Sequence, residues 1–199
     1  MAEVSKNQPR LPNGQFLTKR FPVLTYGQTP TVDTQDWKFE VWGHGINDKM
    51  TWDWEEFNAL GSHETVRDFH CVTTWSRYDN KWQGVPIESV WSAIEANLDD
   101  DIKPGAVMLH CYGGYTTNLL LDDFLHPDNL FASHHDGQPL TIPHGGPMRF
   151  VCHHLYAWKS AKWISGIELL EQDDRGFWER HGYHLRGDPW GEERFSYQE

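Results

Sequence analysis

The sequence has few cysteines and no long apolar run. Its three cysteines, Cys71, Cys111 and Cys152, are widely spaced and form no CxxC pair, which argues against a disulfide scaffold, a zinc ribbon or a redox dithiol. No stretch approaches the roughly 20 apolar residues of a membrane span, and the N-terminus lacks the apolar core of a signal peptide. We therefore expect a cytoplasmic protein without a membrane span.

Positive charge is scarce as well. The 199 residues include 17 Lys and Arg against 29 Asp and Glu, which gives a formal net charge of −12. Binding to a nucleic-acid backbone needs a basic stripe, so nucleic acid is not an expected partner. An anionic ligand would have to be bound by a local group of cations.

Aromatic residues are abundant by contrast, with 11 Trp and 12 His in the chain. Trp is large and needs a partner for its N–H when buried, so this many indicates thick aromatic packing around a core or a cleft. A tryptophan-based glycan-binding module is an alternative, and it would require exposed, coplanar rings.

The length predicts one domain with flanking arms. Pro9, Pro12 and Gly14 interrupt regular structure in an N-terminal arm over residues 1–20, which we expect to be extended or frayed. The main domain is expected over 21–175, and a charged, aromatic tail over 176–199 is expected to pack on the same domain.

Hydrophobic periodicity predicts an α+β fold: a mixed β-sheet or barrel-like core with surrounding helices. Amphipathic helices are predicted over residues 53–60, with Thr51 as a candidate N-cap, and over 86–98, with a short helical stretch before Pro127. Segments 113–117 and 134–146 are interpreted as loops. Strands are predicted over residues 37–41, 66–72, 106–112, 148–152 and 163–170.

Cys71 lies within the polar and aromatic segment FHCVTTWSRYDNKWQGV, residues 69–85, at the predicted end of a strand. A lone cysteine is most often a small buried hydrophobe. Its neighbours are polar, however, and Arg77 or a charged His70 would favour the thiolate. A thiolate can act as a nucleophile, a redox thiol or a soft metal ligand, and the residues alone leave these three open.

Histidines offer a competing metal site. His134, His135, His144, His153 and His154 could ligate an ion, but adjacent residues of a strand point to opposite faces and no HExxH or HxH spacing occurs. We therefore interpret them as polar loop residues or hydrogen-bonding groups rather than as a zinc-hydrolase site.

A third signal is the segment from Lys159 through Ser160 and Ala161 to Lys162, which follows Arg149 closely in the chain. Two lysines around small residues can present backbone N–H groups and positive charge to a phosphate. Exposed lysines are common, but in a chain with a net charge of −12 a local cationic cluster stands out.

Five stretches in order, from about residue 20 to 170, resemble the sulfite oxidase family of molybdopterin-dependent oxidoreductases in its short, haem-free form. They are FPVLTYG at residues 21–27, HCVTTWS with WQGV at 70–76 and 82–85, GGYTTNL at 113–119, HGGPMR at 144–149 and YAWKSAKW at 156–163.

The resemblance implies a molybdenum–molybdopterin cofactor with Cys71 as the thiolate ligand of the metal, a role that suits a soft ligand. It further implies two-electron oxo transfer on a small S-oxide, sulfite-like or N-oxide substrate, with the cofactor carrying the chemistry. By the same resemblance, the cofactor-binding residues would be Tyr26, Gly27, Cys71, Cys111, His144, Arg149, Lys159, Ser160, Ala161 and Lys162.

The sequence departs from the sulfite oxidases in having no haem domain, no further C-terminal domain and no full set of sulfite-pocket arginines. We therefore expect a separate electron-transfer partner that is a cytochrome, a flavoprotein or quinone-linked, and a monomeric protein. Besides Cys71, the candidate catalytic residues are Thr73, Trp75, Arg77 and Tyr115. A metal-free cysteine-nucleophile enzyme and the glycan-binding module are the alternatives.

Overall fold

The computed structural model describes residues 9–199, and its regular elements form two sheets with few helices. In the first, six-stranded sheet, β4 pairs with β5, β9 pairs with β8, and the remaining strands follow the order β1-β5-β8-β10. Its strands are β1 (Phe16–Leu17), β4 (His63–His70), β5 (Trp75–Pro86), β8 (Leu130–His135), β9 (Gln138–Pro139) and β10 (Arg149–Val151).

The second sheet has five strands in the order β3-β2-β11-β6-β7. Its β2–β11 pair is parallel and its other pairs are antiparallel. The strands are β2 (Lys38–Gly43), β3 (Met50–Asp53), β6 (Ala106–Cys111), β7 (Thr116–Leu120) and β11 (Ile164–Leu170). The predicted mixed α+β fold is confirmed, built from two open sheets rather than one closed barrel.

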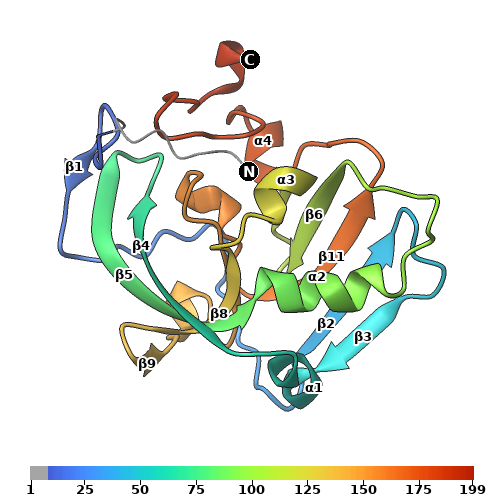
Figure 1. The fold of residues 1–199 in the computed structure, drawn as a ribbon. Helices are drawn as coiled ribbons and strands as arrows, with labels where there is room; N and C mark the ends of the chain where they lie inside the picture. The colour runs from blue at the N-terminus through green and yellow to red at the C-terminus, as the bar shows by residue number, and fades with distance from the viewer. Residues whose placement is uncertain (1–8) are drawn as a thin grey trace.

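The helices are short and lie around the sheets (Figure 1). They are α1 (Trp54–Ala59), α2 (Ile87–Glu95), α3 (Leu121–Phe124), α4 (Phe177–Arg180) and the 3-10 turns η1 (Ile142–His144), η2 (Ala157–Lys159) and η3 (Ser196–Gln198). Helix α2 buries one apolar face, formed by Ile87, Val90 and Ile94. None of the helices in residues 9–199 is long and apolar enough to cross a membrane.

Aromatic side chains form much of the core. Trp37, Phe39 and Phe57 are fully buried in the larger hydrophobic cluster, and each such side chain contributes roughly 1.5–3 kcal/mol by leaving water. A smaller cluster contains Phe69, Trp82 and Cys71. None of the eleven tryptophans is exposed, which is consistent with packing rather than with an open glycan-binding face.

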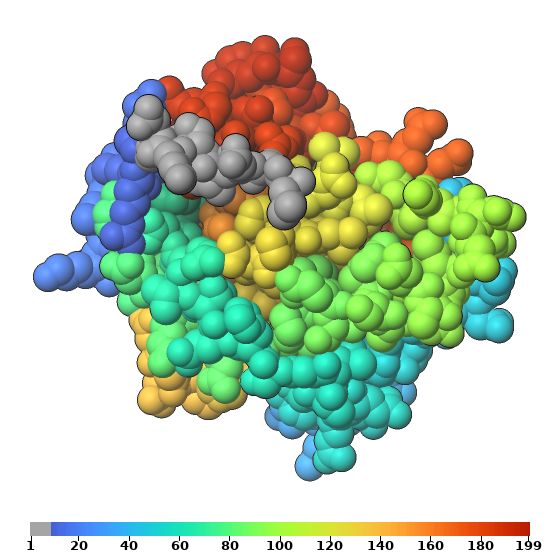
Figure 2. Space-filling model, in the orientation of Figure 1, coloured from blue at the N-terminus to red at the C-terminus, as the bar shows by residue number. Residues whose placement is uncertain are grey.

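Both ends of the described chain pack on the sheets. Strand β1 pairs in parallel with the start of β5, and the Arg10 side chain donates to Asp68 at 2.6 Å. Figure 2 shows the C-terminal segment covering one end of the molecule, next to the N-terminal segment. Arg186 of that segment forms an ion pair with Asp123 at 2.9 Å.

Most predicted elements match the structure to within a few residues, but some predictions are wrong. Residues 113–117 were predicted to be a loop, yet β7 begins at Thr116, and β8 extends to His135 inside the second predicted loop. The twelve-residue β5 was missed. Helix α1 is capped by Asp53 rather than by Thr51, because Asp53 Oδ1 accepts from Glu56 N at 2.9 Å while Glu56 reaches back to Asp53 N.

Three connections position the candidate site. The β4–β5 turn carries Cys71, the β6–β7 turn carries Gly113 and Tyr115, and the β10–β11 connection carries η2 and residues 160–162. Because β10 and β8 belong to one sheet and β6 and β11 to the other, these connections meet where the two sheets adjoin.

Candidate functional site

A cavity of about 500 Å³ lies where these connections meet. Its walls combine segments that are far apart in the chain, including the stretch before β2, the β4–β5 turn and part of the C-terminal segment. The lining residues fall within 21–28, 69–75, 113–115, 143–149, 157–163 and 177–183. Cavities of this volume are typical of small-molecule and cofactor sites.

Cys71 is the thiol on the wall of this cavity, and only 6% of its surface is exposed. The tight turn after β4 fixes it: Cys71 N donates to Trp75 O at 2.9 Å, and Thr74, at φ +77, donates its N–H to Cys71 O at 3.0 Å. The sulfur lies 3.2 Å from Thr73 Oγ1. Burial raises the pKa of the Cys71 thiol, while the hydrogen bonds from Thr73 oppose the rise.

Arg149 brings a buried positive charge to the same cavity. Its guanidinium donates to His144 O at 3.0 Å and to Ser160 O at 2.9 Å, but its buried Nε has no hydrogen-bond partner among residues 9–199. Burial lowers the pKa of Arg149 to about 9, so it stays cationic at neutral pH. No carboxylate within residues 9–199 forms a salt bridge with it, and a buried charge without a counter-ion favours an anionic ligand.

Lys162 is the second cation on the cavity wall. Its Nζ donates to Leu24 O at 2.8 Å, to Thr25 Oγ1 at 3.0 Å and to Pro143 O at 3.0 Å, and burial lowers its pKa to about 8. A Cβ on Gly145 would lie 2.9 Å from the Lys162 Cβ, so glycine at this position leaves room for the lysine. The structure therefore brings Arg149 and Lys162 together, as the sequence predicted.

Ser160 and Ala161, which precede Lys162, offer a ligand little through their side chains. Ser160 lines the cavity, but its hydroxyl accepts from Cys152 N at 2.9 Å and donates to Cys152 O at 3.2 Å. Ala161 is buried outside the lining. The backbone N–H groups of Ala161 and Lys162 reach no backbone carbonyl in the described chain, which leaves them available to an acceptor.

Lys159 points away from the cavity, contrary to the phosphate-binding role implied by the sequence. It is fully buried and pairs with Glu179 at 2.6 Å, and its Nζ also donates to Asn118 Oδ1 at 2.8 Å and to Leu185 O at 2.6 Å. Glu179 also accepts from Trp158 Nε1 at 2.8 Å. Lys159 therefore anchors α4 behind the cavity wall.

Two further predicted residues lie outside the cavity lining. Arg77, on β5, is engaged by Asp136, by Asn80 and, at 3.0 Å, by His135 Nε2. Cys111 is buried in the larger core cluster, where burial raises its pKa and the nearby charge of Arg149 opposes the rise.

The remaining predicted residues do line the cavity: Thr73, Trp75, Tyr115, Tyr26, Gly27 and His144. Trp75 Nε1 is buried and finds no acceptor in the described part of the chain, which leaves one N–H donor on this wall for a ligand. The Tyr115 hydroxyl donates to Trp158 O at 2.7 Å, and burial raises its pKa well above the usual range, so it is a neutral phenol. His144 stacks on Phe21 with ring centroids 4.6 Å apart.

An aromatic wall was missed by sequence reasoning. Phe177, Trp178 and Tyr183 line the cavity from the C-terminal segment, where the Tyr26 ring lies 5.1 Å from Phe177 and Trp178 stacks on Tyr183 at 5.3 Å. No motif marked these residues. The only available signal was the high aromatic content of a segment interpreted as a tail.

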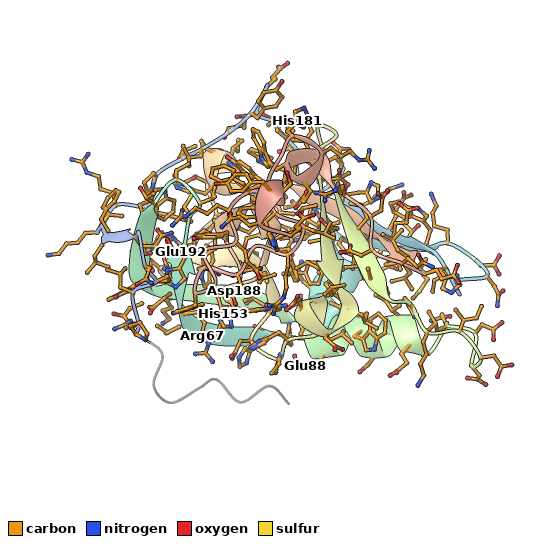
Figure 3. The ribbon with its side chains drawn as sticks, turned by 90° about the horizontal axis from the view of Figure 1, so that it is seen from above. Arg67, Glu88, His153, His181, Asp188 and Glu192 are labelled. Carbon is orange, nitrogen blue, oxygen red and sulfur yellow. The ribbon has the colours of Figure 1, made fainter. Side chains whose placement is uncertain are left out.

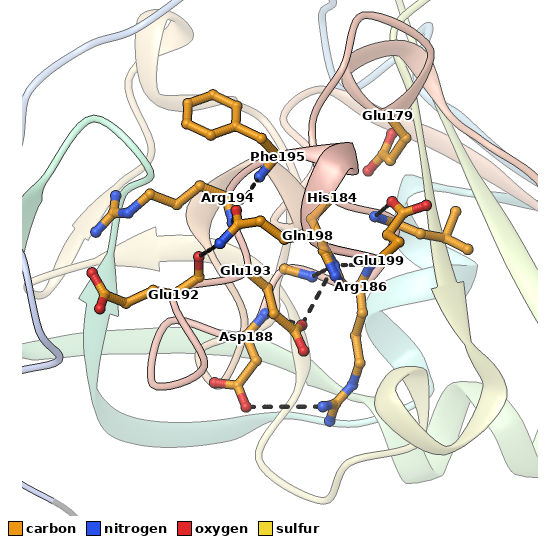
Figure 4. Close-up of polar contacts among 12 residues, drawn as sticks. Glu179, His184, Arg186, Asp188, Glu192, Glu193, Arg194, Phe195, Gln198 and Glu199 are labelled. Atoms are coloured by element: carbon orange, nitrogen blue, oxygen red, sulfur yellow. Dashed lines mark hydrogen bonds and ion pairs between the residues drawn. The ribbon is translucent and has the colours of Figure 1, made fainter.

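Polar contacts within the C-terminal segment hold this wall in place (Figure 4). Gln198 Nε2 donates to Glu192 O at 2.9 Å, and Glu193 lies 3.5 Å from His184 Nδ1. Arg194 reaches across to the cysteine turn and donates to Val72 O at 2.6 Å. The segment is thus tied to both sides of the cavity.

The buried ion pair gives a stability prediction. Lys159→Met should lower the free energy of unfolding by about 3–5 kcal/mol, because it leaves the Glu179 carboxylate buried without its counter-ion. Adding Glu179→Gln should restore part of the loss. Lys49→Met, which breaks an exposed pair with Glu40, should cost less than about 1 kcal/mol. Chemical denaturation measures all of these, and equal losses for Lys159→Met and Lys49→Met would contradict the prediction.

Burial of Cys71 gives a reactivity prediction. In cofactor-free protein, iodoacetamide should alkylate Cys71 slowly at neutral pH and faster as the pH rises, because the raised pKa keeps the thiol protonated. Mass spectrometry of the modified peptide measures the rate, with Cys71→Ser as the control. Rapid alkylation that does not change between pH 6 and pH 8 would instead indicate the activated thiolate of a cysteine-nucleophile enzyme.

Known proteins resemble this chain over most of its length. Residues 26–178 match the family described as oxidoreductase molybdopterin binding domain. The uncharacterized oxidoreductase YuiH of Bacillus subtilis is 45% identical over 194 residues, which cover 97% of this chain and 96% of YuiH.

More distant relatives are larger. The protein-methionine-sulfoxide reductase catalytic subunit MsrP of Campylobacter jejuni is 28% identical over 180 residues, covering 84% of this chain and 59% of MsrP. The crystal structure of the sulfane dehydrogenase SoxCD from Paracoccus pantotrophus superposes with a TM-score of 0.64 at 13% identity, over 77% of this chain and 42% of that one. Together, the matched domain, the identity to YuiH and the shared fold show that the chain belongs to the family of oxidoreductases with a molybdopterin binding domain.

Proposed function

We propose that the protein is a molybdenum-cofactor oxidoreductase that transfers an oxygen atom to or from a small S-oxide, with sulfite-like compounds and N-oxides as related substrates. The observation that supports it most is the placement around one cavity of a thiol, Cys71, and two cations, Arg149 and Lys162, whose hydrogen bonds within residues 9–199 go to carbonyl and hydroxyl oxygens. Family membership supports the cofactor class.

The residues of the cavity fit this cofactor chemically. A buried cysteine is a suitable ligand for a soft, sulfur-coordinated metal, and the coupling of metal binding to loss of the thiol proton offsets the raised pKa of Cys71. Arg149 and Lys162 would bind the anionic phosphate group of the molybdopterin. The backbone N–H groups of Ala161 and Lys162, which reach no backbone carbonyl in the described chain, would add to this binding. Gly113 and Gly114, at φ +87 and +82, would let the pterin approach the backbone.

The cofactor, when bound, supplies the two-electron oxygen-atom transfer, and the chain supplies position, charge and access. Thr73, Trp75 and Tyr115 are the candidate substrate-pocket residues, since they line the cavity. Arg77 does not line it and binds Asp136. Thr73 and Trp75 offer neutral donors, and Tyr115, whose hydroxyl donates to Trp158 O, adds an uncharged wall; such groups suit an uncharged S–O or N–O group better than a doubly charged sulfite. The names of the MsrP relatives, protein-methionine-sulfoxide reductases, support an S-oxide.

Electrons would pass to or from a separate carrier, a cytochrome, a flavoprotein or a quinone-linked protein, because oxo transfer at the metal is a two-electron step that must be balanced. The expected cytoplasmic location and monomeric state stay predictions. No observation favours a glycan-binding module, since no tryptophan is exposed.

Metal analysis tests the proposal directly. Protein purified from a host that makes the cofactor should contain near-stoichiometric molybdenum, by elemental mass spectrometry, and pterin, by fluorescence after oxidative release. Cys71→Ser should lose molybdenum or all activity, since a hydroxyl is a poor ligand for a soft metal. Folded native protein from such a host with neither metal nor pterin would contradict the proposed function.

The two arginines provide a matched pair of variants. Arg149→Met should lower the pterin content of purified protein severalfold, because it removes the buried charge that faces the cavity. Arg77 is close to Cys71 in the sequence, but its guanidinium binds Asp136 and does not line the cavity. Arg77→Met should therefore leave the pterin content unchanged. Equal pterin loss in both variants, with thermal unfolding as the check on folding, would argue against the assigned role of Arg149.

A further inference from the structure

Three histidines outside the cavity form a compact cluster. His126 lies in the loop after α3, and His153 and His154 lie in the turn after β10. Each offers one ring nitrogen, and these three nitrogens lie within 4.8 Å of one another. His153 and His154 occupy a turn rather than a strand, so their side chains need not point to opposite faces.

One nitrogen of the cluster lacks a partner. Within residues 9–199, the buried His153 Nε2 makes no hydrogen bond, and Asp128 Oδ2 lies 3.6 Å from it. That distance is too long for a good hydrogen bond but close to the ~3.4 Å that separates two ligands of a tetrahedral ion with bonds of about 2.0–2.1 Å. An ion between the two atoms would satisfy both.

The surrounding groups hold the ligands in place. Asp128 uses its other oxygen, Oδ1, to bind Arg67, which leaves Oδ2 free, and Figure 3 shows Arg67 beside His153. Asp123 Oδ1 lies 3.2 Å from His154 Nε2. Arg186 fixes Asp123 through two hydrogen bonds, at 2.9 and 3.0 Å. Metal-binding histidines are commonly oriented by such a carboxylate.

We propose that His126, His153 and His154, with the carboxylate of Asp128, form a binding site for a divalent metal ion of borderline softness, with zinc as the representative ion. Three imidazoles and one carboxylate suit zinc and its neighbours, whereas calcium and magnesium prefer oxygen ligands throughout. None of the four residues lines the cavity.

The ion would join two loops that are otherwise separate in the chain. One loop follows α3. The other follows β10 and begins at Cys152, whose backbone is hydrogen bonded to the Ser160 hydroxyl. His126 and His154 are stacked with ring centroids 4.4 Å apart, so binding requires these rings to turn as well as to draw closer. The ion would crosslink these two loops at residues outside the cavity lining, so the site does not depend on the proposed cofactor.

Cobalt is the probe for the test, because a four-coordinate Co²⁺ ion has strong visible absorption and occupies zinc sites. The full-length protein, with its cofactor and without an affinity tag, is treated with a chelator and titrated with Co²⁺, and the bound ion is then displaced with Zn²⁺. We expect one Co²⁺ per chain and a rise in Tm. His153→Gln and His126→Gln should each weaken Co²⁺ binding by at least about 10-fold.

Two controls separate the possible results. His63→Gln, at the exposed start of β4, should bind Co²⁺ like the unchanged protein, and so should Cys71→Ser, which keeps this readout independent of the molybdenum site. Unchanged Tm values of the metal-free His126 and His153 variants would exclude a folding defect. Absence of the visible band with excess Co²⁺, or equal affinity in His153→Gln and His63→Gln, would overturn the proposal.

Discussion

The buried ion pair between Lys159 and Glu179 connects three parts of the fold that would otherwise be independent. It joins the η2 turn to α4, and through Asn118 and Trp158 it includes β7 and the cavity wall. Burying two charges is costly unless both are paired and their remaining hydrogen-bonding groups are satisfied. The network meets most of that demand, and the C-terminal segment is thereby held at one position beside the cavity.

In the cavity, by contrast, the positive charges of Arg149 and Lys162 are not neutralised by paired carboxylates of the described chain. Arg149 and Lys162 are tied to carbonyl and hydroxyl oxygens rather than to carboxylates, so their positions are fixed while their charges remain. In a chain with a net charge of −12, acidic partners are plentiful. Their exclusion from these two cations is a local property of the structure, and it accounts for how an acidic protein can hold an anionic ligand.

Much of this fold was predictable from hydrophobic periodicity, and the exceptions have physical reasons. Strand β5 was missed because its buried positions include Ser76 and Asn80, whose polarity is satisfied by hydrogen bonds to His70 and to backbone carbonyls. A polar pattern therefore did not indicate a loop. Resemblance placed Cys71, Arg149 and Lys162 together, but spacing could not show that Lys159 faces the core or that Arg77 is engaged by Asp136. Nor could it bring His126 to His153, since that contact depends on how two distant loops pack.

The cavity wall contains residues from both ends of the described chain, from Phe21 to Tyr183, and Arg194 is hydrogen bonded to the cysteine turn 122 positions earlier. A nascent chain emerges from the ribosome from its N-terminus, so Cys71 and Arg149 are synthesised well before the aromatic wall exists. The cavity is complete only after residues up to Tyr183 have left the ribosome. A ligand that fills the cavity can therefore be enclosed only after the aromatic wall formed by Phe177, Trp178 and Tyr183 has docked.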